Sequence, residues 1–124
     1  MINTNDLRKF IFNTLKTFCD NVYFDLADED KVFPHIVFSF QTIDNNDLSR
    51  SDIYMDIDVW GRQEEAVEFE NLCDLVERTF SYNNAPQDTN LPTFYNINRV
   101  NVIDEDKTLK HRTIEVLIQN YTRE

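Results

Sequence analysis

Three carboxylates on strand-like segments are the residues whose types and spacing could do chemistry. Asp56 and Asp58 alternate within residues 51–60, so both side chains would project from one face of a strand. Glu115 falls on the outward face of a later strand-like segment, where it could supply a third oxygen ligand. Such a trio can hold a divalent cation, and metal-dependent catalysis is the chemistry it would support.

The surroundings of these carboxylates disfavour that chemistry. A nuclease would add a nearby lysine, and Lys110 is available, but the basic groove that a phosphate substrate needs is absent from the sequence. A solvated or interface-facing acidic strand is the more common arrangement. We therefore predict no enzymatic activity, no metal and no other cofactor. A metal-dependent enzyme that uses Asp56, Asp58 and Glu115 stays open as an alternative.

The other reactive side chains lack partners at catalytic spacings. His35 follows a proline and His111 opens a strand, and both are expected at the surface or at a strand edge. None of the four serines has a GxSxG or SxxK context. Cys19 and Cys73 fall on apolar stripes of predicted helices, so we interpret them as buried thiols, with one disulfide as the alternative.

Length and composition limit the class of protein. The chain has 124 residues, of which 41% are hydrophobic, with ten Phe, five Tyr and one Gly. This predicts one domain over residues 1–124 and excludes a glycine-rich phosphate loop. No segment approaches the length of an apolar membrane span, and no secretory leader opens the chain. We expect no membrane partner and assembly in the cytoplasm.

The net charge of −11 is concentrated in the middle of the chain. Residues 27–80 hold fourteen acidic and four basic side chains, whereas the two flanking segments are nearly neutral. Such a surface repels the phosphates of nucleic acid at short range. Ordinary DNA binding is therefore excluded as a function.

Two amphipathic helices are predicted from apolar residues that recur three and four positions apart. The first covers residues 4–19, with Thr4 or Asn5 as its N-cap. The second runs from residue 63 to about residue 82 and carries an acidic outer face. We interpret that face as solvated, with a docking surface for a basic partner as the alternative. The acidic residues are Glu64, Glu68, Glu70, Asp74 and Glu77.

Alternating apolar and polar residues predict the strands, with two antiparallel hairpins among them. The predicted strands are residues 21–26, 34–43, 51–60, 94–103 and 109–121. With the two helices they predict an α+β fold. It consists of a mainly antiparallel sheet of four to five strands with both helices packed on one face.

The segment 51–60 alternates without a break and defines both faces of this sheet. One set of side chains is apolar and must face the core: Ile53, Met55, Ile57 and Val59. The other set is half aromatic and half acidic, which is unusual for a surface left bare in a monomer. It consists of Tyr54, Asp56, Asp58 and Trp60. The single glycine, Gly61, is expected to end the strand with a sharp redirection.

Several segments together resemble one known family. The aromatic strand 33–38 comes first, and the strand 56–60 then runs into the long acidic helix. After a proline-containing loop, a hairpin with the turn 104–107 closes on residues 112–121. This order is similar to the tail terminator proteins of long-tailed bacteriophages of the siphovirus type, also called tail-completion or tail-to-head joining proteins. Gly61-Arg62 departs from the polar helix cap expected there.

The resemblance implies a structural virion protein at the head–tail junction. An α+β protomer would assemble into a hexameric ring that caps the tail tube, ends its polymerisation and joins the tail to the head connector. DNA would pass through an acidic channel without being bound, and no catalytic residue is implied. A ring would also bury an open patch of each protomer against its neighbour.

The candidate interface or channel residues follow from the open sheet face and the first hairpin loop. They are Tyr54, Asp56, Asp58, Trp60, Glu115, Asp44 and Asp47. The polar loops 44–50 and 83–92 are expected to be mobile and to contact the tail tube or the connector. A second function remains open, because a small acidic protein of this size could be a DNA mimic that inhibits a DNA-processing enzyme.

Overall fold

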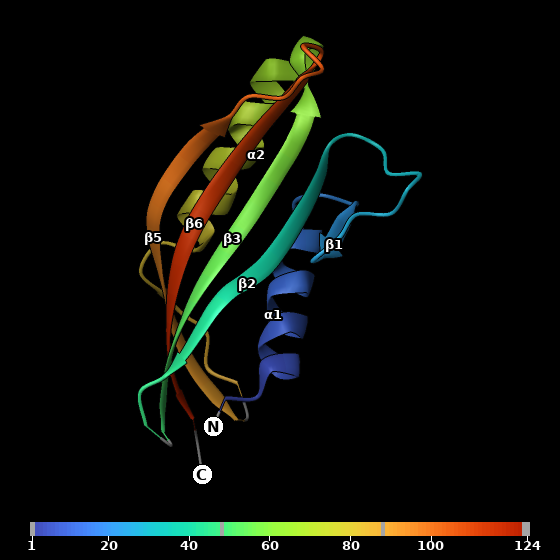
Figure 1. Cartoon of the computed structure of the whole chain (residues 1–124). Coiled ribbons are helices and arrows are strands. Elements are labelled where there is room, and N and C mark those ends of the chain that lie inside the picture. Colours follow the sequence, from blue (N-terminus) through green and yellow to red (C-terminus); the bar gives the residue numbers. More distant parts are fainter. Residues whose placement is uncertain (1, 48, 88, 123–124) are drawn as a thin grey trace.

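A curved sheet with two helices on one face forms the protein, and the computed structural model describes residues 2–47, 49–87 and 89–122 (Figure 1). Both helices lie behind the long strands in that view. In chain order the elements are α1 (Thr4–Lys16), β1 (Val22–Phe24), β2 (His35–Asn45), β3 (Arg50–Arg62), η1 (Gln63–Glu65), α2 (Ala66–Thr79), β4 (Asn83–Asn84), β5 (Asn90–Val102) and β6 (Leu109–Thr122).

The sheet has six strands in the order β1-β2-β3-β6-β5-β4. The hairpins β2–β3 and β5–β6 are antiparallel, as predicted, and β3 joins them by pairing with β6 along its whole length. The predicted sheet, mainly antiparallel with four to five strands, differs from the structure in two details. β1 pairs in parallel with β2, and β4 adds a sixth strand. β4 consists of two asparagines, which give no alternation to detect.

One buried cluster unites the sheet with both helices. The predicted core face of β3 is buried throughout, and Ile114, Val116 and Ile118 of β6 lie beside it, also as predicted. Leu7, Ile11 and Leu15 of α1 belong to the same cluster. So do Phe69, Cys73 and Val76 of α2. Cys19 and Cys73 are free, buried thiols, which confirms that interpretation.

The ends of the helices differ in detail from the sequence prediction. Asn3, not Thr4 or Asn5, caps α1, because its side-chain oxygen accepts a hydrogen bond from the backbone N–H of Asp6 at 3.1 Å. The second predicted helix begins with the 3₁₀ turn η1 and ends at Thr79. No helix within the described ranges combines the length and the hydrophobicity that crossing a bilayer requires.

Gly61 has a different role from the predicted one. β3 continues through it to Arg62, and its backbone does not enter the left-handed region. A Cβ atom at this position would lie 2.5 Å from Cδ1 of Phe69 in α2. The glycine is therefore needed for the close approach of α2 to the sheet, not for a turn.

Candidate functional site

The open sheet face, opposite the helices, carries five of the seven candidate residues. Tyr54 is 43% exposed, and the other four are half-buried. In the β3–β6 register Asp56 lies directly opposite Glu115, and Trp60 lies opposite His111. The structure thus brings together on one surface the residues Tyr54, Asp56, Asp58, Trp60 and Glu115.

The two remaining candidates lie at the other end of the β2–β3 hairpin. Asp44 faces Asp52 across the strands, whereas Asp58 is paired with Val37 near the start of β2. Asp47 lies in the loop, where its carboxylate accepts hydrogen bonds from the Ser49 N–H and hydroxyl at 2.7 and 2.8 Å. These bonds lower the pKa of Asp47. The seven residues therefore do not form one cluster.

The carboxylates on the open face are not equivalent. Burial, together with the charges of Asp58 and Glu115, raises the pKa of Asp56. Burial acts in the same direction on Asp58, but hydrogen bonds from His111 and Thr113 outweigh it and lower the pKa of Asp58. Both bonds use the same oxygen, at 2.9 Å from His111 Nε2 and 2.6 Å from the Thr113 hydroxyl.

A metal site does not assemble from these residues. Within the described ranges, no group of three or more His, Cys, Asp or Glu side chains has an arrangement that could hold a metal ion. Asp58 is directed toward His111 and Thr113, and Glu115 lies opposite Asp56. The trio shares a face, as predicted, without converging on a common point.

Both histidines lie in a stack on Trp60, which corrects their prediction as isolated surface or edge residues. The Trp60 ring is stacked on His111 with centroids 3.7 Å apart and on His35 with centroids 5.9 Å apart. His35 is only 1% exposed, and its Nδ1 lies 3.2 Å from the Val32 carbonyl oxygen. Burial is the main cause that lowers the pKa of His35.

A hollow of about 300 Å³ lies beside this stack. Its walls come from the loop after β1 and from the open face, and apolar side chains alternate in it with Lys31 and Asp58. Its lining residues are Asp25, Leu26, Ala27, Lys31, His35, Val37, Asp58, Trp60 and His111.

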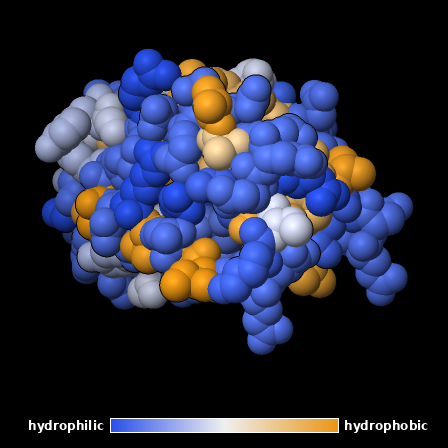
Figure 2. All heavy atoms as spheres, turned by 90° about the horizontal axis from the view of Figure 1, so that it is seen from above, coloured by the Kyte–Doolittle hydropathy of each residue, from blue (hydrophilic) through white to orange (hydrophobic). Residues whose placement is uncertain are grey.

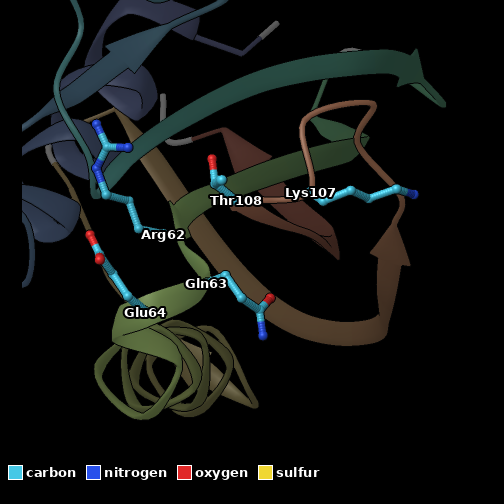
Figure 3. Close-up of a pocket in the computed structure, with 5 residues that line it drawn as sticks. All are labelled: Arg62, Gln63, Glu64, Lys107 and Thr108. Atoms are coloured by element: carbon cyan, nitrogen blue, oxygen red, sulfur yellow. The ribbon is translucent and has the colours of Figure 1, made fainter.

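A second hollow of about 440 Å³ lies where β3 passes into η1 (Figure 3). Arg62, Gln63 and Glu64 form one side, and Lys107 and Thr108 form the other. The backbone N–H of Gln63 donates to the Thr108 carbonyl at 2.7 Å, which fixes the junction. The lining contains no histidine, cysteine or serine, so it offers no paired nucleophile and base.

Arg99 neutralises much of the acidic helix face, which the sequence reasoning missed. Its guanidinium reaches Glu70 at 2.5 Å, Asp74 at 2.6 Å and Glu77 at 3.1 Å, and Arg112 binds Glu70 at 3.0 Å. The face predicted to be solvated is therefore partly paired within the chain. Fewer acidic side chains on this face therefore remain available to bind a basic partner.

A β-bulge explains why Arg99 could not be placed from the sequence. Phe94 is buried, so strict alternation would put position 99 on the open face. The register shifts between Asn96 and Asn98, and Arg99 then pairs with the buried Ile114 on the helix side. One extra residue in the strand reverses the direction of every side chain after it.

Comparison with known proteins gives one family and a fold. The family model for Tail completion protein gp17 matches residues 13–119. Among similar solved structures is a chain of the virion of a native gene transfer agent particle, with a TM-score of 0.58 and 9% identity. The match covers 87% of this chain and 83% of that one, and at this identity it shows the fold alone. No curated protein matches the chain.

Replacing Arg99 tests the ion-pair network. Arg99→Gln should lower the free energy of unfolding by about 1–3 kcal/mol, because Asp74 and Glu77 lose their ionic partner and Glu70 keeps only Arg112. Arg78→Gln is the matched control. Arg78 is exposed on α2, the helix that carries the three carboxylates, and its guanidinium makes a long hydrogen bond of 3.4 Å to the Asp74 carbonyl. It should change stability by less than about 0.5 kcal/mol. Equal effects in urea denaturation would contradict the network.

Replacing His35 tests its burial through pH. Because the pKa of His35 is lowered on folding, the unfolded chain binds more protons just below the ordinary value of about 6.5. Stability should therefore fall as the pH drops below about 6.5, and then level off below the folded pKa. In His35→Phe this component should disappear. Parallel pH profiles of the wild type and the variant would show that His35 is not buried in its neutral form.

Proposed function

The chain belongs to the Tail completion protein gp17 family and has its place in the phage virion tail, and from this we propose that it forms a ring that caps the tail tube. In this role it ends tail polymerisation and joins the tail to the head connector. Its partners in this role are further copies of the chain, the tail tube protein and the head connector.

The open sheet face is the observation that carries the ring proposal. It extends over β3 and β6, combines aromatic with acidic side chains, and leaves Tyr54 and Tyr121 43% and 47% exposed. A monomer gains nothing from such a surface, whereas an assembly can use it as a contact or as a wall. We assign six copies to the ring and a siphovirus-type tail to the phage.

The charge of that face suits a channel for DNA. Asp52, Asp56 and Glu115 project from it, and Asp56 and Glu115 face one another directly. Like charges at opposed positions cost stability, so folding alone does not account for them. Facing a channel, they would repel the phosphates and keep DNA from adhering to the wall.

Two other functions are less well supported. A DNA mimic needs a continuous acidic surface, yet Arg99 and Arg112 neutralise acidic residues on α2. A metal-dependent enzyme needs a free Asp58, yet its Oδ1 already accepts from Thr113 and lies 2.9 Å from His111. Membership in a structural tail family also favours a role without catalysis.

Measurement of assembly tests the proposal. The purified chain, alone and mixed with the tail tube protein of the same phage, should form rings or bind tube ends, as seen by sedimentation and negative-stain electron microscopy. A strict monomer that ignores tube ends and binds a DNA-processing enzyme would support the DNA mimic instead. Binding of a divalent cation that is lost in Asp56→Asn would support the enzyme.

Charge reversal on the open face tests the channel. Glu115→Lys places a cation opposite Asp56, so the fold should be retained while the wall becomes less acidic. In a phage that depends on the variant, particles should assemble in normal numbers but release DNA more slowly. Glu68→Lys is the control, because it makes the same charge change on an exposed helix position. Equal DNA release by the two variants would exclude Glu115 from the channel wall.

A further inference from the structure

The two free edges of the sheet suggest how copies of the chain meet. Building on the proposed ring, we propose that the open edge of β2 in one copy pairs in antiparallel fashion with the open edge of β5 in the next copy. The contact would be made by backbone hydrogen bonds, with apolar side chains on either side. Each copy would then use two different edges, one for each neighbour.

Both edges are open over most of their length in the described part of the chain. β1 covers β2 only at residues 36–38, and β4 covers β5 only at residues 93–94. The stretches 39–45 and 95–102 have no outer strand in the sheet order. Backbone donors and acceptors along an edge strand can pair with a strand from another chain.

Backbone contacts show which groups point toward these edges. On β2 the Ile36 N–H donates to Asn21 and the Phe38 carbonyl accepts from Asp25, both at 2.9 Å, so alternate residues point outward. On β5 the Arg99 N–H donates to the side chain of its own neighbour Asn98 at 2.9 Å. That donor is satisfied locally and could be transferred to a strand of a second copy.

Strand direction favours a ring with this contact. β2, β3, β6 and β5 are consecutive in the sheet and each pair is antiparallel, so β2 and β5 run in opposite directions. Copies related by rotation about a ring axis would therefore bring β5 beside β2 in the antiparallel sense. The alternation of the sheet would continue from copy to copy without turning any protomer over.

The covered parts of the two edges add a geometric condition. β1 covers the end of β2 that lies opposite residues 57–59 of β3, whereas β4 covers the end of β5 that lies opposite residues 118–119 of β6. Residues 118–119 of β6 pair with residues 52–53 of β3, so the two covered ends lie several residues apart along the strands. The free stretches are thus offset along the strands. A closed ring accommodates such an offset if its strands are inclined to the axis, as in β-barrels, where the tilt is about 35–45°.

Exposed apolar side chains lie within each free stretch. Ile43 on β2 is 36% exposed, and Ile97 and Val100 on β5 are 54% and 38% exposed. Seen from above, the surface is largely hydrophilic, with apolar groups in separate small patches (Figure 2). Two distinct patches on opposite edges fit a head-to-tail contact, because a two-fold dimer needs only one self-complementary patch.

With edge pairing, one of the two faces of the sheet lines the channel. A closed sheet has one layer inside and one outside, and both helices pack on the same face. With the helices outside, the acidic open face with Asp56 and Glu115 becomes the inner wall. Tyr54, Asp56, Asp58 and Trp60 would then be channel residues and not contacts between copies.

Single lysine substitutions test the two edges. Ile43→Lys should block the β2 edge and Ile97→Lys the β5 edge, and each should convert rings to monomers in native mass spectrometry. Val67→Lys is the matched control, because Val67 is 71% exposed on α2 and lies on neither edge. Circular dichroism and urea denaturation should show that all three variants fold. Intact rings in both edge variants would overturn the edge contact.

Mixing the edge variants gives a sharper result. Ile43→Lys keeps its β5 edge and Ile97→Lys keeps its β2 edge, so an equal mixture should form one-to-one dimers but no closed rings. A mixture that stays monomeric would overturn head-to-tail pairing. In the wild type, the amides of Phe40 and Arg99 should gain protection from hydrogen exchange on assembly, and unchanged exchange there would also count against edge pairing.

The same set of measurements separates the inference from the proposed function. If the wild type forms rings and both edge variants form them as well, edge pairing is refuted and the ring proposal still holds. A wild-type chain that neither assembles alone nor binds tube ends would refute both.

Discussion

Burial of the apolar face of β3 is the constraint on which the rest of the structure depends. Its four side chains are each at most 1% exposed, and burying a side chain of this kind contributes roughly 1.5–3 kcal/mol. β3 lies between β2 and β6, and α2 packs over β3 and β6. A slip of one residue would put this set in water, so the register is fixed. The residues concerned are Ile53, Met55, Ile57 and Val59.

The same constraint determines the open face and explains what could be predicted from the sequence. Side-chain direction alternates, so burying one set of β3 residues forces Tyr54 and Asp56 to the other face. That face, both helices and both hairpins followed from local periodicity. The Trp60 stack did not, because it depends on pairing between strands that are distant in the sequence. Arg99 was not identified, because a bulge in β5 decides which face it joins. Gly61 was given the wrong role, because the close approach of α2 depends on tertiary packing.

The negative charge of the chain is treated differently on the two faces of the sheet. The acidic middle of the chain divides into a helix side and an open-face side. On the helix side Arg99 and Arg112 offset Glu70, Asp74 and Glu77. On the open face burial, together with the neighbouring charges of Asp58 and Glu115, raises the pKa of Asp56. The fold therefore neutralises the helix side with two arginines, whereas on the open face Asp56 lies opposite another carboxylate, Glu115.

A β-bulge interrupts each of the two open edges of the sheet. Flat free edges pair indiscriminately, and proteins commonly prevent this by twisting the edge. Here β2 shifts register between Phe40 and Thr42, and β5 shifts between Asn96 and Asn98. Both irregularities lie within the free stretches, so a strand can pair with either edge only if it matches the local bend. In the proposed ring the complementary edge of another copy would provide this match.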